Sequence, residues 1–256
     1  MIRVIVTGAA GKVGREVLSA VSAEADMEVV AAVDPLHAGE TVADVVLVAD
    51  LAAAIAETNP DVLVDFTHPS VVALNVATAL RAGVNCVVGT TGLTTEVIEE
   101  LAEGAHDGAC LFVAPNFAIG AVLMMRFAAE AARFMPHVEI IELHHDRKAD
   151  APSGTALRTA GLIAEARTFV PESPGRETEI APGARGALVD DVSIHSVRLP
   201  GLVAHQEVLF GGQGQTLSIR HDSIDRTSFM PGVLLAVREV GRHSGLVVGL
   251  EHFMEQ

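Results

Sequence analysis

Short runs of apolar, often β-branched residues recur along the first half of the chain, and each run ends in a loop of small or polar residues. These runs cover 2–7, 27–33, 61–66, 85–88 and 110–113. Continuous apolarity over this length is typical of strands covered on both faces of a parallel sheet. Helical patterns lie between them, for example at 71–81 and 95–101, and Asp50 is placed to cap a short helix from Leu51. The alternation predicts an α/β fold that begins with a Rossmann-like, doubly wound parallel sheet.

The pattern changes after residue 117. A helix is expected at 118–134. A loop rich in Pro, Gly, Glu and Arg is expected at 171–186, and it could be either a lid or a plain surface loop. Strand-like runs follow at 191–199, 203–210 and 216–220. The glycine-rich turn at 211–214 makes the last two runs a hairpin. This half predicts a second α+β domain with a mixed or antiparallel sheet.

A final helix is predicted at 229–240, and an apolar run follows at 246–250. We expect one domain at 1–117 and 229–256, which binds a dinucleotide. The second domain is expected at 118–228.

A glycine-rich turn follows the first strand, and its residues are expected to bind the cofactor: Gly8, Ala9, Ala10, Gly11, Lys12 and Val13. Glycines at a strand-to-helix turn let the backbone approach a pyrophosphate, whose charge is met by the helix N-terminus. Asp34 ends the next strand, about 20 residues further on, where an acidic side chain accepts from ribose hydroxyls. No arginine adjoins Asp34, which favours NADH over NADPH. Lys12 partly offsets this, so both cofactors are retained.

Other loops are expected to line the same crevice, because ligands of open α/β sheets sit at the carboxyl ends of the strands. These loops follow the strands that end near Thr67, Val88 and Val113. The residues assigned there to cofactor binding are Gly89, Thr90, Thr91, Ala114, Pro115, Asn116 and Phe117. Their small and hydroxyl side chains allow close approach of the nicotinamide half.

The stretch 139–155 carries the candidate chemistry. It begins as an alternating strand and then places His144, His145 and Lys148 close together, ahead of a helical pattern that starts near Gly154 and Thr155. Imidazole titrates near neutrality and the pKa of a desolvated ammonium can be drawn toward it, so His144 and Lys148 suit proton transfer. Free N–H groups at the helix start form a carboxylate or phosphate site. The stretch therefore predicts an anion site beside proton carriers.

Composition narrows the classes of function. The chain has 256 residues, 50% of them apolar, and a formal charge of −16, which disfavours nucleic acid and anionic membranes as partners. Cys86 and Cys110 are too few and too far apart for a Cys-x-x-Cys metal site or a disulfide framework, so no metal is expected. The chain enters a strand at once and has no apolar run long enough for a membrane span. We expect a soluble, cytoplasmic protein.

The same stretch closely resembles the substrate signature of the 4-hydroxy-tetrahydrodipicolinate reductase (dihydrodipicolinate reductase) family of bacterial lysine and diaminopimelate biosynthesis. The family pattern Glu-x-His-His-x-x-Lys-x-Asp-Ala-Pro-Ser-Gly-Thr-Ala is matched at Glu142, His144, His145, Lys148, Asp150, Ala151, Pro152, Ser153, Gly154, Thr155 and Ala156. The loops at Thr67, Gly89 and Pro115 also resemble the family's cofactor-contacting segments, so the likeness extends over more than half of the chain.

The resemblance implies an NAD(P)H-dependent reduction of a cyclic imine dicarboxylate. By analogy with the family, Lys148 is expected to be the proton donor, and His144 to assist or relay the proton. The same analogy gives His145, Gly154 and Thr155 the task of holding the substrate carboxylates. The second domain would then be the substrate-binding and oligomerisation domain of a homotetramer.

Other readings remain beside this one. A short-chain dehydrogenase needs a catalytic tyrosine, and the chain contains no tyrosine. A zinc-dependent alcohol dehydrogenase lacks a credible set of Cys and His ligands here. An NADH-sensing regulator without turnover would not need paired proton carriers, and we find no DNA-binding element in the sequence. Another small-molecule amino-acid dehydrogenase of similar fold would have to explain the whole match from Glu142 to Ala156 as coincidence.

Overall fold

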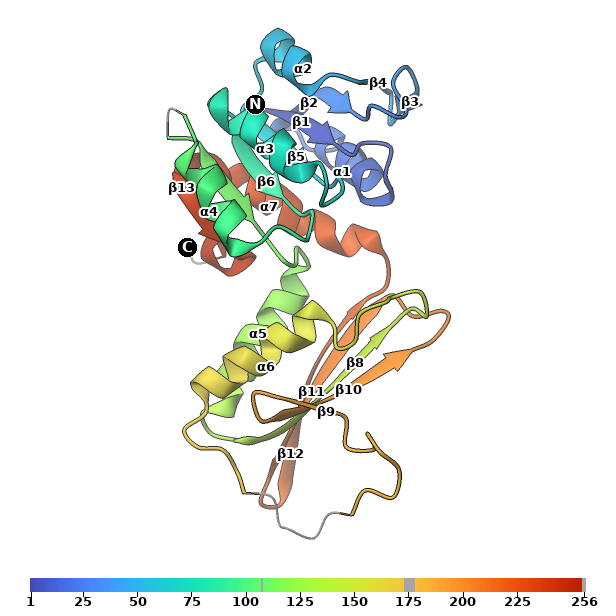
Figure 1. The fold of residues 1–256 in the computed structure, drawn as a ribbon, viewed down its shortest axis with the longest axis vertical. Helices are drawn as coiled ribbons and strands as arrows, with labels where there is room; N and C mark the ends of the chain where they lie inside the picture. Colours follow the sequence, from blue (N-terminus) through green and yellow to red (C-terminus); the bar gives the residue numbers. More distant parts are fainter. Residues whose placement is uncertain (107, 173–177, 255–256) are drawn as a thin grey trace. The chain divides into compact units, whose positions relative to one another are not determined.

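The computed structural model describes residues 1–106, 108–172 and 178–254, and the chain divides into two compact units. Unit 1 comprises 1–117 and 226–256, and unit 2 comprises 118–225. The upper part of Figure 1 is unit 1, in which blue and green segments from the start of the chain are joined by red segments from its end. Each unit has a β-sheet and helices of its own.

Unit 1 is built on an eight-stranded sheet in the order β13-β7-β6-β5-β1-β2-β4-β3. Its strands are β1 (Ile2–Thr7), β2 (Met27–Val33), β3 (Thr41–Val42), β4 (Val45–Val48), β5 (Val62–Asp65), β6 (Asn85–Val88), β7 (Cys110–Val113) and β13 (Gly245–Val248). All neighbours pair in parallel except β3 and β4. The parallel sheet predicted from the apolar runs is confirmed, and the final apolar run joins it beside β7.

Helices cover both faces of this sheet. They are α1 (Lys12–Ser22), α2 (Leu51–Thr58), α3 (Val72–Arg81), α4 (Thr95–Glu103) and α7 (Met230–Glu239), with short 3₁₀ turns η1 (Arg226–Phe229), η2 (Val240–Arg242) and η3 (Leu250–Phe253). Helices α2, α3 and α4 contact one another along one face, and α1 contacts α7 on the other (Figure 1). The Asp50 cap is confirmed: its Oδ1 accepts from the Ala53 N–H at 3.1 Å.

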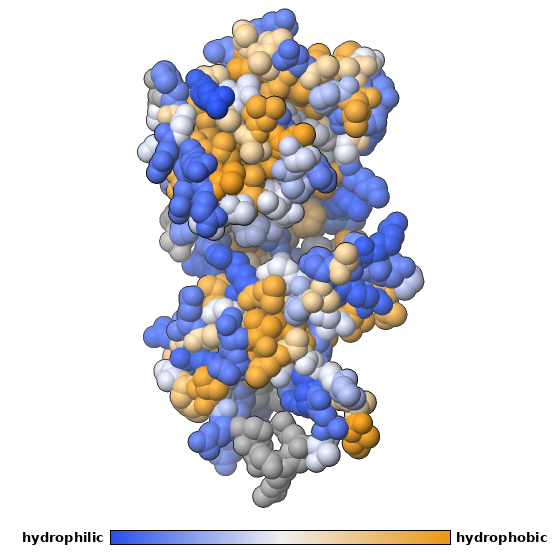
Figure 2. Space-filling view, in the orientation of Figure 1, coloured by the Kyte–Doolittle hydropathy of each residue, from blue (hydrophilic) through white to orange (hydrophobic). Residues whose placement is uncertain are grey.

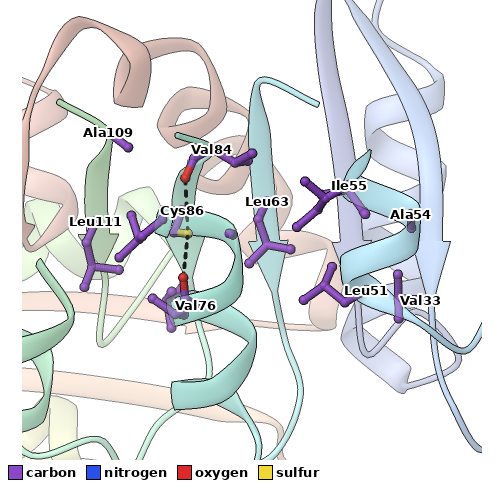
Figure 3. Packing of buried hydrophobic residues seen from close by; sticks show 14 of the residues in the cluster. Val33, Leu51, Ala54, Ile55, Leu63, Val76, Val84, Cys86, Ala109 and Leu111 are labelled. Atoms are coloured by element: carbon purple, nitrogen blue, oxygen red, sulfur yellow. Dashed lines mark hydrogen bonds between the residues drawn. The ribbon is translucent and has the colours of Figure 1, made fainter. Parts of the chain in front are cut away.

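The core on the α2–α3–α4 side is made of aliphatic side chains from the sheet and the helices. Figure 3 shows Leu63 and Cys86 from the strands facing Ile55 and Val76 from the helices. Leu63 and Cys86 are fully buried. Burial raises the pKa of the Cys86 thiol well above its ordinary value, so this cysteine behaves as a small apolar core residue.

The β3–β4 hairpin was not predicted from the sequence. Its turn residues Ala43 and Asp44 have φ values of 47° and 63°. Alanine rarely adopts this left-handed conformation, so the pair carries no glycine signature of a hairpin turn. The two strands are also short, because β3 has 2 residues and β4 has 4.

Unit 2 contains a five-stranded sheet in the order β12-β11-β8-β10-β9. Its elements are α5 (Ile119–Ala132), β8 (His137–His144), α6 (Gly154–Ala166), β9 (Ala187–Val189), β10 (Val192–Arg198), β11 (Ala204–Gly212) and β12 (Gln215–Ser223). The expected hairpin is β11–β12, and β8 pairs antiparallel with β11 but parallel with β10. The sheet is therefore mixed, as predicted.

One face of the unit 2 sheet is covered by α5 and α6, which contact each other and the strands. Ile140, Ile194, Val208 and Phe210 are buried on that face. Gln206 ties α6 to β11, since its Nε2 donates to the Thr159 hydroxyl at 2.8 Å. The opposite face has no helix of unit 2 over it within the described residues.

The long loop expected at 171–186 is described only in part, because residues 173–177 lie outside the described part of the structure. Across the described ranges, no helix has the length and apolarity that crossing a bilayer would require.

Candidate active site

The glycine-rich turn between β1 and α1 approaches the neighbouring backbone closely. Gly8 has a φ of +72°, and a Cβ on it would lie 2.3 Å from the Phe66 carbonyl oxygen. A Cβ on Gly14 would lie 2.1 Å from the Gly8 oxygen. Gly11 is the N-cap of α1 and offers no side-chain cap, so the first-turn N–H groups of this helix have no side-chain acceptor. These N–H groups suit a pyrophosphate.

Asp34 follows β2 and is tied to this turn. Its Oδ2 accepts from the Ala10 N–H at 3.1 Å, and its Oδ1 lies 2.9 Å from Nδ1 of His37. The structure thus brings Asp34 and the glycine-rich turn together, as the dinucleotide reading requires. His37 as a partner of Asp34 was not expected from the sequence.

A fully buried carboxylate, Asp65, organises the carboxyl ends of three neighbouring strands. Oδ1 accepts from the Thr90 hydroxyl at 2.6 Å, from the Thr67 hydroxyl at 2.7 Å and from the Thr67 N–H at 3.1 Å. Oδ2 accepts from the Thr7 hydroxyl at 2.7 Å and from the Asn75 amide at 2.9 Å. Thr90 is one of the residues assigned to cofactor binding, so this carboxylate fixes the loop that carries it.

The other predicted cofactor residues lie at the same edge of the sheet, because they follow β6 and β7. Gly89 faces the Phe66 ring so closely that a Cβ would lie 2.1 Å from it. Phe117 is buried, with its ring 5.5 Å from that of Phe66. Ala114 is buried, Asn116 is partly buried, and Thr91 and Pro115 are exposed.

These observations together fit a dinucleotide in unit 1. The glycine turn gives close backbone approach, and the first-turn N–H groups of α1 have no side-chain acceptor. Asp34 offers a carboxylate for a ribose, and small residues line the loops after β6 and β7. Lys12 and Val13 are the first residues of α1, and Ala9 is buried in the turn before it. The residues assigned to the cofactor all lie near the carboxyl ends of the strands of the unit 1 sheet.

The candidate catalytic residues gather in unit 2, at the end of β8. Nδ1 of His144 lies 2.5 Å from Oε2 of Glu142, whose side chain is fully buried. Arg198 donates to both oxygens of that carboxylate, from Nη1 to Oε2 at 2.9 Å and from Nη2 to Oε1 at 2.8 Å. The parallel pairing of β8 with β10 sets Arg198 directly beside His144.

Charged partners keep Glu142 ionised despite its burial. Burial alone would raise the pKa of Glu142, but the hydrogen bonds from His144 and Arg198 outweigh it and lower the pKa to about 2. An ionised carboxylate can only accept, so Nδ1 of His144 carries the proton in this hydrogen bond. Glu142 therefore fixes the His144 tautomer and leaves Nε2 as the ring nitrogen for chemistry.

Lys148 lies in the turn after β8 and is connected to the same network. Its Nζ donates to Oδ1 of Asp150 at 2.8 Å, and the pKa of Asp150 is lowered by this hydrogen bond. The backbone oxygen of Asp150 accepts from Nη2 of Arg198 at 2.7 Å. Arg198 therefore links the turn that carries Lys148 to the Glu142–His144 pair.

The start of α6 is the place where the sequence predicts an anion site. The helix begins at Gly154, one residue before Thr155, and the Ser153 hydroxyl caps it by accepting from the Ala156 N–H at 3.2 Å. Nothing lies within 4 Å of where a Cβ of Gly154 would be, so there is open space before the first turn. The Ser153 N–H donates to Oε1 of Glu142 at 3.3 Å, which joins the helix start to the network of Glu142, His144 and Arg198.

His145 follows His144 at the end of β8 and is partly buried. Its Nδ1 is buried and makes no hydrogen bond with the described residues. Buried polar atoms of this kind usually have a partner, so Nδ1 is suited to a ligand or an ordered water. This is consistent with the substrate-binding role expected of His145.

Arg198 is the functional residue that reading the sequence missed. It is the last residue of a strand that was predicted, but its partner Glu142 lies 56 positions earlier. An arginine at the end of a strand that alternates apolar and polar residues was the available signal. Only the strand pairing identifies the partner, and pairing does not follow from periodicity.

Solved proteins of low sequence identity to this chain share its fold. A solved amine dehydrogenase of Mycobacterium smegmatis has a TM-score of 0.66 at 15% identity, covering 96% of this chain and 94% of its own. At that identity the likeness shows the fold alone, a mostly parallel sheet with helices on both faces and a second unit built on a mixed sheet.

Comparison with known proteins identifies the family. The family model described as dihydrodipicolinate reductase, N-terminus, matches residues 2–117, and that described as dihydrodipicolinate reductase, C-terminus, matches 120–254. The 4-hydroxy-tetrahydrodipicolinate reductase of Nocardia farcinica is 55% identical over 258 residues, covering 99% of each chain. A dipicolinate-bound dihydrodipicolinate reductase from Paenisporosarcina has a TM-score of 0.86 at 45% identity, covering 98% of this chain and 99% of its own.

The chain belongs to the dihydrodipicolinate reductase family and is an NAD(P)H-dependent oxidoreductase. The resemblance drawn from residues 142–156 is confirmed by these matches, which extend over nearly the whole chain.

Proposed function

We propose that this protein reduces 4-hydroxy-tetrahydrodipicolinate to tetrahydrodipicolinate with NADH or NADPH, in lysine and diaminopimelate biosynthesis. The observation that carries the proposal is the network around Glu142, which joins His144, Arg198 and the turn of Lys148 to the start of α6. This network offers positive charge for a dicarboxylate and N–H groups for its oxygens. It also provides two proton carriers.

Substrate binding falls to the start of α6 and to His145. The start of α6, at Gly154 and Thr155, would receive a substrate carboxylate, because the positive end of the helix dipole favours its charge there. Nδ1 of His145 supplies a further polar contact. A substrate with two carboxylates is matched by two such groups of donors.

Proton delivery falls to Lys148, assisted by His144. The Lys148 ammonium is partly buried, its side chain being 23% exposed, and Asp150 holds it by one hydrogen bond. Of its three N–H groups, two remain to serve the substrate. His144 keeps its Nδ1 proton on Glu142, so Nε2 can relay or assist the transfer.

Unit 1 binds the cofactor, which supplies a hydride when bound. Its pyrophosphate is held by the turn from Gly8 to Val13 and its adenosine ribose by Asp34, while the loops after β6 and β7 receive the nicotinamide half. Thr90 is fixed there by Asp65. Binding and orientation of the cofactor thus depend on unit 1 and proton transfer on unit 2.

A coupled assay tests the proposed reaction. Aspartate semialdehyde and pyruvate are condensed in the cuvette by the synthase, and oxidation of NADH, then of NADPH, is followed by absorbance. We expect rapid oxidation that depends on the synthase. Binding of NADH without any synthase-dependent oxidation would contradict the proposal and favour a different dehydrogenase or a regulator that binds NADH.

The assembly and the compartment are proposed alongside the reaction. We infer a homotetramer, which is supported by the face of the unit 2 sheet that α5 and α6 leave uncovered and by exposed Leu188 and Leu209 on that face. Figure 2 shows orange, hydrophobic residues among blue, hydrophilic ones on the face in view. Light scattering of the purified protein measures the mass, and a monomeric mass would contradict the tetramer.

A cytoplasmic location agrees with two buried, unpaired cysteines.

A further inference from the structure

The carboxylate proposed to hold the adenosine ribose has a histidine as its second partner. Asp34 is held between two groups of unit 1: Ala10 donates its N–H to Oδ2 at 3.1 Å, and Nδ1 of His37 lies 2.9 Å from Oδ1. The Asp34 side chain is 14% exposed and that of His37 is 44% exposed. The His37 imidazole is therefore more exposed to solvent than the Asp34 carboxylate that is proposed to bind the ribose.

The position of His37 is fixed by the backbone. Asp34 and His37 close a turn after β2, since the His37 N–H donates to the Asp34 carbonyl at 3.1 Å. The Asp34 N–H donates to the Val48 carbonyl at 3.0 Å, and the Glu40 N–H donates to the His37 carbonyl at 3.0 Å. The turn is thus anchored to β4, and the ring stays beside the carboxylate.

The charge of this pair changes with the protonation of His37. With neutral imidazole, the Asp34 carboxylate keeps its full negative charge and repels the 2′-phosphate of NADPH. With imidazolium, the pair is neutral overall, and the second ring N–H adds a donor for a phosphate oxygen. NADH carries a 2′-hydroxyl in place of the phosphate and is far less sensitive to this charge.

The groups around His37 favour the protonated form. The hydrogen bond to Asp34 raises the pKa of His37 above its ordinary value, and the charges of Asp34 and Glu40 act in the same direction. Burial and the nearby Arg15 oppose them. Lys12, at the start of α1, adds a fixed positive charge to the same turn.

We propose that His37 sets the choice between NADH and NADPH according to pH, admitting the 2′-phosphate when it is protonated and disfavouring it when it is neutral. The inference rests on the proposed function, because it takes the dinucleotide to bind with its ribose at Asp34. In this proposal His37 acts as a selector, meaning a group whose protonation decides which nucleotide binds better. The Asp34 carboxylate alone does not provide this.

Equilibrium binding tests the selector without turnover. Dissociation constants for NADH and NADPH are measured by nucleotide fluorescence from pH 6 to pH 8.5 on the full chain. For the unmodified protein, the preference for NADPH relative to NADH is expected to fall by roughly three- to tenfold as pH rises, the scale of one partly exposed charge-assisted hydrogen bond. The fall should centre above the ordinary pKa of histidine, because that of His37 is raised.

Three variants separate His37 from other titrating groups. His37→Gln keeps only the pH dependence of the 2′-phosphate itself, whose second ionisation lies near pH 6. His37→Arg keeps a permanent charge and should prefer NADPH more strongly than the unmodified protein at pH 8.5. His252→Gln is the matched control, because His252 is exposed in η3, which follows the strand at the opposite edge of the sheet.

The outcomes decide both proposals separately. An equal pH dependence in His37→Gln and the unmodified protein would overturn the selector, while tight binding of both nucleotides would leave the proposed function intact. Failure of both nucleotides to bind at every pH would overturn both proposals. A flattened ratio in His37→Gln, an elevated ratio in His37→Arg and an unchanged one in His252→Gln would support the selector.

Discussion

The two units each bury a carboxylate completely, and they satisfy it in different ways. Glu142 in unit 2 is paired with the Arg198 guanidinium and with His144. Asp65 in unit 1 accepts from three hydroxyls, an amide and a backbone N–H, all of them neutral. A buried charge needs partners in either case.

The difference between the two carboxylates matches the work proposed for each unit. Unit 2 must bind an anion and move a proton, so a carboxylate with cationic partners both orients His144 and holds charged groups close to the anion site. Unit 1 must hold several loops still while a nucleotide binds. Neutral donors from one strand, two loops and a helix achieve this without placing further positive charge at the crevice.

Removing the cation from Glu142 should give the largest effect on stability. In Arg198→Met the buried carboxylate loses two charge-assisted hydrogen bonds, so the free energy of unfolding should fall by about 3–5 kcal/mol. Urea denaturation followed by circular dichroism measures this. Arg198→Lys keeps a charge but cannot bind both oxygens, and it should lie in between. A loss below about 1 kcal/mol in Arg198→Met would show that Glu142 does not depend on this pair.

Acid should unfold the protein through Glu142, with a slightly smaller effect. Its pKa is lowered from an ordinary 4.5 to about 2, so its contribution to stability is complete above pH 4.5 and is lost as pH falls toward 2. That contribution amounts to about 3 kcal/mol, of which about 2 kcal/mol is lost by pH 3. Urea midpoints between pH 6 and pH 3 measure it. Glu142→Gln should remove this part of the slope, and an unchanged slope in that variant would refute the assignment.

Removing one hydroxyl from the hydrogen-bond network of Asp65 should give the smallest loss of stability. The Thr90 hydroxyl donates to Asp65 and accepts from the Thr67 N–H at 2.7 Å, so Thr90→Val leaves both groups short of a partner. We expect a loss of about 1–2 kcal/mol in the free energy of unfolding and weaker NADH binding. Thr90→Ser retains the hydroxyl and is the matched control. If valine and serine behaved alike in NADH titration and urea denaturation, the hydroxyl would have no role in this loop.

Much of unit 1 could be predicted from the sequence because its signals are local. Continuous apolar runs located β1, β2, β6 and β7 with the bounds that the structure has, and the turn at Gly8 and the carboxylate of Asp34 were placed by spacing along the chain. The match at 142–156 located the candidate catalytic residues in the same way. In each case the information lies within one element or one turn.

The networks that support the site could not be predicted, because they join residues that are distant in sequence. Asp65 binds Thr7, which lies 58 positions away, and Thr90, which lies 25 positions away. Arg198 meets Glu142 only because β10 pairs in parallel with β8. Periodicity reports which side chains are buried but not which strands become neighbours, so these partners required the structure.

The most direct test of the account is turnover and NADH affinity in Lys148→Ala. The proton donor is proposed to lie in unit 2 and the nucleotide in unit 1, so kcat in the coupled assay should fall by roughly 10²–10⁴-fold while the dissociation constant for NADH stays the same. Lys148→Arg keeps the positive charge but gives up no proton, so its kcat should fall too, with a smaller change in KM. Near-normal kcat in Lys148→Ala would contradict the account.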